Sequence, residues 1–184
     1  AAYAFAKLEF KGRDFLFLAY LGSIAVPWQV YMIPQFILMR ELGLVDKHMS
    51  LILLQAFTAF GVFLLRQFFI SVPNEILDAA RIDGLSEYGI YFRIMLPLSK
   101  PALATLTIFS AVFVWNDFMG PLIYLNDQNL YPLSMGVFAL QVFQVGNYGL
   151  MMAASILMTL PVILLFFLAQ RHFIEGITLT GLKG

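Results

Sequence analysis

Few side chains in this sequence are of the types that carry out acid–base, nucleophilic or metal chemistry. Cysteine is absent, which excludes disulfides and thiol chemistry. Histidine occurs only at His48 and His172. No stretch matches the GxxxxGK[ST] pattern that cradles nucleotide phosphates. The sequence therefore predicts no catalytic residue and no metal site, and a chain that is not itself an enzyme.

One polar cluster interrupts an otherwise apolar stretch: Trp115, Asn116 and Asp117, followed by Pro121. A charge at the centre of a membrane costs at least about 2.5–3.5 kcal/mol, so such residues usually face protein or water. The cluster could line a path for a polar substrate, with Trp115 offering its face to a sugar ring. Alternatively, the cluster is a helix end near the outer membrane surface, where Trp is common and Asp117 is hydrated. We favour the second interpretation.

The rest of the chain is apolar enough to require a membrane. Of its 184 residues, 61% are hydrophobic and only 12% are charged, and the mean hydropathy is +0.84. Soluble domains carry about a quarter charged residues, so the polar surface here is too small to cover a soluble globule. The formal net charge of zero gives no indication of a nucleic-acid partner. The expected fold class is all-α, a polytopic transmembrane helical bundle.

Four apolar stretches are long enough to cross a bilayer, which requires about 20 helical residues. These predicted spans are residues 15–39, 49–70, 102–125 and 148–169. Between the last two, residues 133–145 are predicted to form an amphipathic helix at the membrane surface, and residues 170–184 are predicted to be a tail. The apolar start, AAYAFA, is typical of the end of a membrane helix whose beginning is missing. We therefore expect a bundle truncated at its N-terminus.

The basic residues predict the orientation of these spans. Four spans place Ala1, the segment 72–101 and Gly184 on one side of the membrane. That side carries nine of the 11 Lys and Arg residues. The positive-inside rule assigns it to the cytoplasm and places the chain in the cytoplasmic membrane. His48 and His172 then lie on opposite sides and cannot form one site.

The longest polar segment, residues 72–101, is predicted to contain two short helices. Pro73 suits the first turn of a helix capped by Ser71 or Val72. Gly84 suits the left-handed position that ends a helix. The first helix has these residues on one predicted face: Ile76, Ala79, Ala80 and Asp83.

A second short helix is predicted to follow, with Ser86 as its cap. Pro97 and Pro101 are expected to stop it and to restart the chain in a new direction. One side of this helix is predicted to carry Tyr88, Tyr91, Phe92 and Met95. The sequence of this segment thus predicts a bent pair of helices between two apolar stretches.

The same segment resembles the EAA loop of the permease subunits of binding-protein-dependent ABC importers. The family pattern is E-A-A, three residues, Gly, nine residues and I-x-L-P. Here Asp78-Ala79-Ala80, Gly84 and Ile94-x-Leu96-Pro97 fall on those spacings, with Asp78 in place of Glu. Further segments are similar to permeases of maltose-type sugar importers: RQFF at 66–69, WNDF at 115–118 with PL at 121–122, and GLKG at 181–184.

This resemblance implies a permease that works with a sister permease, two cytoplasmic ATPase subunits and an extracytoplasmic solute-binding protein, within membrane lipid. It implies that ATP and Mg are held by the ATPase subunits and that this chain holds no cofactor. It also implies that residues 73–100 dock in a groove of the ATPase. The residues expected to form this coupling loop are Glu75, Asp78, Ala79, Ala80, Asp83, Gly84, Tyr91, Phe92, Ile94, Leu96 and Pro97.

The predicted function is therefore ATP-driven import of a carbohydrate. One alternative is a permease of the same superfamily that carries another solute, such as an amino acid or glycerol phosphate. The WNDF segment and the tail favour a sugar. A second alternative is a self-contained secondary transporter, but the spans lack paired carboxylates or a proton relay.

Overall fold

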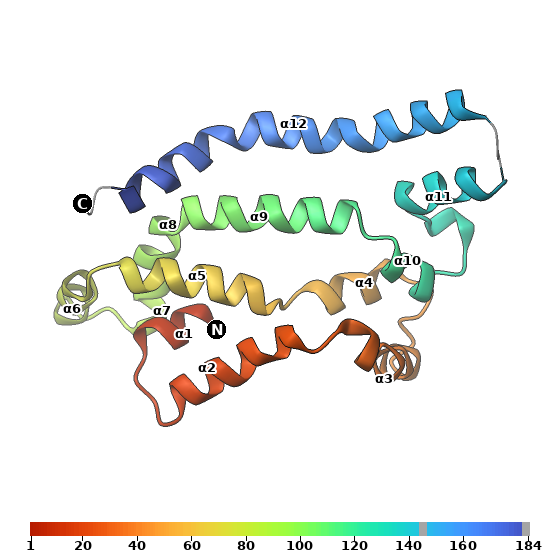
Figure 1. Cartoon of the computed structure of the whole chain (residues 1–184). Coiled ribbons are helices and arrows are strands. Elements are labelled where there is room, and N and C mark those ends of the chain that lie inside the picture. Colours follow the sequence, from red (N-terminus) through yellow and green to blue (C-terminus); the bar gives the residue numbers. More distant parts are fainter. Residues whose placement is uncertain (144–146, 182–184) are drawn as a thin grey trace. The chain divides into compact units, whose positions relative to one another are not determined.

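Every regular element in the described part of the chain is a helix, which confirms the all-α class. The computed structural model describes the backbone of residues 1–143 and 147–181, and the side chains of residues 1–142 and 147–168. The helices form two compact units, whose elements are labelled in Figure 1. The first unit contains residues 1–26, 57–107 and the chain from residue 171. The second contains residues 27–56 and 108–170.

The helices of the first unit are α1 (Ala2–Lys7), α2 (Arg13–Gly22), η1 (Ser23–Ala25), α5 (Ala59–Ser71), α6 (Asn74–Ile82), α7 (Glu87–Ile90), η2 (Tyr91–Met95) and α8 (Leu96–Leu98). Those of the second unit are α3 (Trp28–Glu41), α4 (His48–Gln55), α10 (Met119–Tyr124), η3 (Gln128–Leu130) and α11 (Leu133–Phe143). Two helices belong partly to each unit: α9 (Lys100–Trp115) and α12 (Tyr148–Gly181).

One described helix, Tyr148–Leu168 within α12, is long and apolar enough to cross a membrane by itself. Up to four spans result if three broken helix pairs each count as one. These pairs are Arg13–Ala25 with Trp28–Glu41, His48–Gln55 with Ala59–Ser71, and Glu87–Leu98 with Lys100–Trp115. The crossing of a membrane by these segments stays a prediction.

The first two breaks have local causes. Val26 is extended because it precedes Pro27, which disfavours helical geometry in the residue before it. At the second break Thr58 is also extended, and its Oγ1 accepts a 3.1 Å hydrogen bond from the Gly61 amide, which starts α5. The predicted spans 15–39 and 49–70 each contain one of these breaks.

The predicted span 102–125 contains the end of one helix and the whole of another. Helix α9 begins at Lys100 and ends at Trp115, and α10 follows at Met119–Tyr124. The helix predicted over residues 133–145 is present as α11 up to Phe143; residues 144–146 lie outside the described part. The predicted tail continues α12 as far as Gly181, and residues 182–184 lie outside the described part.

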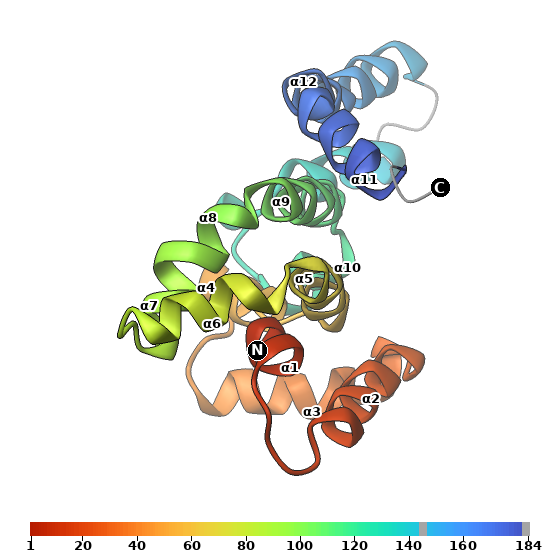
Figure 2. The ribbon, with the colours of Figure 1, turned by 90° about the vertical axis from the view of Figure 1, so that its left-hand side faces the viewer.

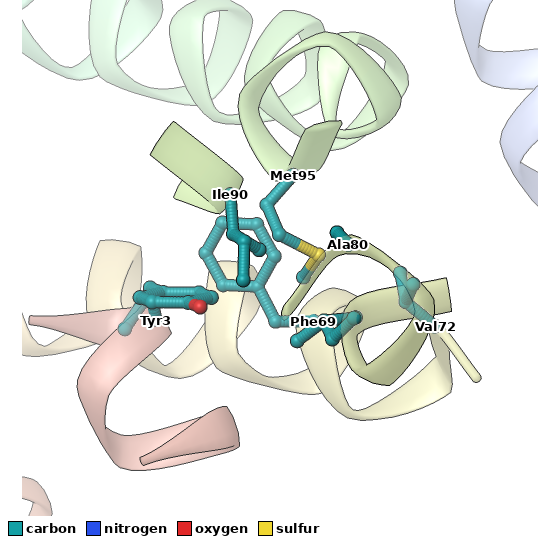
Figure 3. Packing of buried hydrophobic residues seen from close by; sticks show 8 residues of the cluster. Tyr3, Phe69, Val72, Ala80, Ile90 and Met95 are labelled. Carbon is teal, nitrogen blue, oxygen red and sulfur yellow. The ribbon is translucent and has the colours of Figure 1, made fainter. Parts of the chain in front are cut away.

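The core of the first unit is an apolar cluster where α1, α5 and the helices of residues 72–101 meet. Helix α1 lies along α5 (Figure 2). In Figure 3, Tyr3 from α1 and Phe69 from α5 gather with Ile90 and Met95. Ile90 and Met95 are fully buried. The whole cluster comprises Ala2, Tyr3, Phe69, Val72, Leu77, Ala80, Ile90 and Met95. Burial of these side chains fixes the polar segment to the helices beside it.

Candidate functional site

The segment 72–101, which we call the coupling loop, begins with the amphipathic helix α6. Pro73 is the residue that precedes the helix, and Asn74 is its first residue, one position later than predicted. Glu75 lies in the first turn and Arg81 in the last. Both charges are favourable, because the helix dipole is positive at the N-terminus and negative at the C-terminus.

The two faces of α6 have different surroundings. Leu77 and Ala80 are buried in the core cluster, whereas Ile76, Ala79 and Asp83 are exposed. The prediction of one face shared by Ile76, Ala79, Ala80 and Asp83 is therefore wrong for Ala80. The physical reason is that Leu77, the larger apolar side chain, takes the inward position, and Ala80 lies one turn further along the same face.

Gly84 ends α6 in the left-handed conformation, as predicted, with φ +83°. The Leu85 amide donates to the Ala80 carbonyl and the Gly84 amide to the Arg81 carbonyl, each at 3.0 Å. This pair of bonds is the Schellman motif. A Cβ at position 84 would meet no described atom within 4 Å. The site therefore requires glycine for its backbone conformation and not for space.

The second half of the coupling loop is helical from Glu87 to Leu98. Ser86 caps it as predicted: its Oγ accepts a 3.3 Å hydrogen bond from the Gly89 amide. The prediction that Pro97 stops the helix is wrong. A wider turn, η2, precedes Pro97, and the Leu96 amide donates to the Tyr91 carbonyl five residues back. This π-type turn relieves the clash that proline makes in a regular helix. The helix bends by 73° only at Ser99, before α9.

The outer face of the coupling loop carries large apolar side chains that are exposed. Ile82, Tyr88 and Phe92 are 86%, 80% and 61% exposed. Met95, predicted to share a side with Tyr88 and Phe92, is fully buried instead. The wider turn places Met95 on the core side, together with Ile90. Ile82, Tyr88 and Phe92 are therefore accessible to a partner.

A chain of polar contacts connects the coupling loop to α1. The Tyr3 hydroxyl donates a 2.6 Å hydrogen bond to Glu87 Oε2. Arg81 Nε donates to Glu87 Oε1 at 2.8 Å, and Arg81 also pairs with Asp78 at 2.7 Å. These contacts with Arg81, and next with Tyr3, hold the pKa of Glu87 below its ordinary value. Glu87 is thus a carboxylate anion whose two oxygens bind two different helices.

Lys7 makes a second connection between α1 and the coupling loop. Its Nζ donates to the Val72 carbonyl at 2.6 Å and to Asn74 Oδ1 at 2.7 Å. The contacts of Tyr3, Lys7 and Glu87 were not predicted from the sequence. Only the Asp78–Arg81 pair has a local signal, the spacing of three residues on a helix.

The structure brings the predicted coupling residues into one loop, but not onto one surface. Glu75, Asp78, Ala79, Asp83, Gly84, Phe92 and Pro97 are exposed; Tyr91, Ile94 and Leu96 are half-buried; Ala80 is buried. The exposed residues are available to a partner, and the buried ones hold the loop in place. Their contact with an ATPase stays a prediction.

The Trp115–Asp117 cluster lies where α9 ends. Trp115 Nε1 donates to the Met158 carbonyl of α12 at 2.8 Å, and Asn116 Nδ2 donates to the Val112 carbonyl at 2.8 Å. The donors of both side chains therefore bind backbone carbonyls within the second unit. A place for Trp115 and Asn116 beside a substrate stays a prediction.

Asp117 joins three elements of the second unit. Its Oδ2 accepts from Gln55 Nε2 of α4 at 2.9 Å, and its Oδ1 accepts from the Gly120 amide of α10 at 3.1 Å. Its backbone carbonyl accepts a 2.7 Å hydrogen bond from Ser134 of α11. Asp117 is half-buried, so it is less hydrated than the favoured interpretation expected. The Asp117 carboxylate thus has a structural role, since it connects α4 to α10.

A second carboxylate, Asp46, holds two loops of the second unit together. Its Oδ1 accepts hydrogen bonds from the amides of Asn126 and Asp127 at 2.8 and 2.9 Å. Its own amide donates to the Tyr124 carbonyl at 2.7 Å. The amides of Asp127 and Asn126 hold the pKa of Asp46 below its ordinary value of 3.8. Asp46 makes this contact with a positive φ of 63°.

Among the side chains of residues 1–142 and 147–168, no three His, Asp or Glu residues lie close enough to hold a metal ion. His48 Nε2 lies 2.9 Å from the Leu130 carbonyl, so this imidazole is hydrogen-bonded to backbone. The side chain of His172 lies outside the described part of the chain.

Known proteins resemble this chain over almost its whole length. Residues 1–178 match the family described as binding-protein-dependent transport system inner membrane component. The arabinooligosaccharides transport system permease protein AraQ of Halalkalibacterium halodurans is 41% identical over 182 residues, which are 99% of this chain and 65% of that protein. The lactose transport system permease protein LacG of Rhizobium radiobacter is 34% identical over 176 residues, 96% of this chain and 64% of that protein.

A solved structure is similar as well. It is the crystal structure of a bacterial ABC transporter involved in the import of the acidic polysaccharide alginate. The TM-score is 0.75 and the identity 27%, over 94% of this chain and 66% of that chain. The chain thus spans slightly less than two thirds of the length of AraQ and of LacG.

Proposed function

Because the chain belongs to the family of binding-protein-dependent transport system inner membrane components, we propose that it is part of a permease subunit of an ATP-driven importer that moves a carbohydrate into the cell. The proposed partners are a sister permease, two cytoplasmic ATPase subunits that bind ATP and Mg, and an extracytoplasmic solute-binding protein. A carbohydrate is proposed because relatives over almost the whole chain carry names that refer to arabinooligosaccharides and lactose.

The coupling loop is the observation that carries this proposal. In this proposal the energy of ATP reaches the permease from the ATPase subunits, and that requires a contact surface. The loop offers one: its inner side is buried in the core cluster, and its outer face exposes Ile82, Tyr88 and Phe92. A partner that displaces this outer face moves the buried side as well, because packed side chains do not slide freely.

The proposal is tested with the complete chain, co-expressed with its sister permease and the ATPase. Ile82→Ser and Phe92→Ser should reduce the amount of co-purified ATPase and the ATP hydrolysis that substrate-loaded binding protein stimulates. Leu42→Ser is the matched control, because Leu42 is 57% exposed and lies on the predicted opposite side of the membrane. The proposal fails if the unaltered chain purifies without ATPase, or if all three variants behave alike.

Uptake of labelled solutes tests the substrate class. Vesicles that contain the complete complex should accumulate a sugar from a panel of mono- and oligosaccharides. Uptake of glycerol phosphate or an amino acid, with no sugar transported, would contradict the carbohydrate assignment and leave the importer assignment intact.

A further inference from the structure

The coupling loop is attached to the rest of the first unit both by the chain itself and by side-chain contacts. The covalent attachments are those of α6 to α5, through Val72 and Pro73, and of α8 to α9, through Ser99. Besides its packing in the core cluster and the contacts of Lys7, the loop is joined to α1 by the hydrogen bond between Tyr3 and Glu87. These two residues are 84 positions apart in the sequence, so the contact belongs to the fold and not to local helix geometry.

The bond between Tyr3 and Glu87 lies beside the turn that joins the two halves of the loop. Gly84 separates α6 from α7 and adopts the left-handed conformation that glycine reaches without steric cost. Glu87, on α7, accepts from Arg81 of α6 through one oxygen and from Tyr3 of α1 through the other. One carboxylate therefore fixes α7 to α6 across the glycine and fixes both to α1.

Tyr3 is held in position for this contact. Its side chain is 8% exposed, and its ring contacts Phe69 of α5 edge to face, with 6.1 Å between centroids. The centroid of the Tyr91 ring lies 5.4 Å from that of Tyr3. At the far end of α1, Lys7 binds the Val72 carbonyl, and Arg66 of α5 donates to the Phe5 carbonyl at 3.2 Å. Helix α1 is thus held along its length, so a displacement of Tyr3 moves the whole helix.

We infer that Tyr3 and Glu87 are positioning residues for energy coupling. Their hydrogen bond, supported by Arg81, locks the angle between α6 and α7 and connects the coupling loop to α1. Displacement of the outer face then moves α1 together with α5. This inference rests on the proposed function, because it presumes a partner that displaces the loop.

The test compares Tyr3→Phe, Glu87→Ala and the double variant in reconstituted complexes that contain the complete chain. Tyr3→Phe removes one hydroxyl and keeps the ring contacts with Phe69 and Tyr91. Tyr20→Phe, in α2, is the matched control. The measured quantity is the amount of solute transported per ATP hydrolysed, normalised to assembled complex, with the thermal stability of each complex measured in parallel.

In Tyr3→Phe, solute transported per ATP should fall by at least about tenfold, the lower end of the factor expected for one hydrogen bond to a charged group. The double variant should be no worse than Glu87→Ala alone, because both changes remove the same contact. Tyr20→Phe should match the unaltered complex. If Tyr3→Phe lowers thermal stability but leaves transport per ATP unchanged, or if the two changes add independently, the inference is wrong. A failure of the proposed function is distinguishable, since the unaltered complex would then show no stimulated hydrolysis.

Discussion

Gln55 donates a 2.9 Å hydrogen bond from its side-chain amide to Asp117 Oδ2, while its own Oε1 is buried without a hydrogen-bond partner among the described residues. The other Asp117 oxygen accepts from the Gly120 amide. A Cβ at Gly120 would lie 2.5 Å from Asp117 Oδ2, so this corner of the second unit has no spare room. The arrangement identifies which changes at Asp117 can be accommodated.

Asp117→Asn should be tolerated, with uptake within a few-fold of normal. The new Oδ1 can accept from Gly120, and the new amide can donate to Gln55 Oε1 once the Gln55 amide turns over. Asp117→Ala should be worse, because it leaves the Gln55 and Gly120 donors unpaired, at a cost of about 1–3 kcal/mol. The measurements are thermal unfolding of the purified complex and uptake.

Asn116→Ala serves as a control for loss of a neighbouring polar side chain, since among the described residues the Asn116 side-chain amide donates only to the Val112 carbonyl, four residues back in the chain. If Asp117→Asn abolished uptake and left thermal stability normal, the structural account would be contradicted. The alternative interpretation of Asp117 as part of a substrate path would then be favoured.

Gly84→Val should uncouple transport from ATP hydrolysis without preventing assembly. A non-glycine residue forced to the left-handed conformation costs roughly 1–2 kcal/mol, and the strain falls on the turn between α6 and α7. Gly84→Asn should be milder, because Asn adopts positive φ more readily. Stimulated ATP hydrolysis in reconstituted vesicles is the measurement, with co-purification as the check on assembly.

Gly22→Val is the control for this pair. The φ of Gly22 is −57°, which any residue adopts, and a Cβ at this position would meet no described atom within 4 Å. Normal stimulation in Gly84→Val would show that the conformation of the turn at Gly84 is unimportant for coupling.

Local chemistry was sufficient to predict the turn between the two halves of the coupling loop. Gly84 adopts the left-handed conformation and Ser86 caps α7, because each outcome depends on a few neighbouring residues. The bond between Tyr3 and Glu87 could not be predicted, since it depends on how α1 docks in the fold. Likewise, periodicity could not decide whether Ala79 or Ala80 faces the core, because both positions suit a small residue.

The predicted span 102–125 contains a change of helix that its hydropathy does not indicate. Hydropathy averages over a window, and the apolar residues on both sides of Asn116 and Asp117 concealed the end of α9. In the structure α9 ends before this pair, and Asp117, two residues before α10, accepts the amide hydrogen of Gly120 in the first turn of α10. A polar pair inside an apolar stretch thus marked a change of helix as well as a candidate site.

Labelling of introduced thiols should place Ile82 and Gln128 on opposite sides of the membrane. These 184 residues contain no cysteine, so each new thiol is the only one among them. Ile82 is 86% exposed, and Gln128 is exposed in η3, so both are accessible. In intact cells an impermeant reagent should modify Gln128→Cys and leave Ile82→Cys unmodified until the membrane is permeabilised. Modification of Ile82→Cys from outside would contradict the orientation derived from the basic residues.

Asp46→Ala should release the loop of residues 126–131 from the loop before α4. Alanine removes the oxygen that accepts from Asn126 and Asp127, and it disfavours the positive φ of this position. Asp46→Asn should keep the contact, because one amide oxygen can accept both hydrogens and Asn tolerates this backbone conformation. Hydrogen exchange at the amides of Asn126 and Asp127 measures the outcome: protection should be lost in the first variant and kept in the second.

Acid provides an independent test of the same contact. The pKa of Asp46 is lowered in the folded protein, so its stabilising contribution is complete above its ordinary value of 3.8 and is lost as the pH falls below that value through the lowered pKa. Protection of the Asn126 and Asp127 amides should therefore decrease in this acidic range in the unaltered protein. In Asp46→Asn this protection should not depend on pH in the same range, because the side-chain amide of asparagine does not titrate. Equal acid sensitivity in both proteins would assign the loss of protection to another group and contradict this role of Asp46.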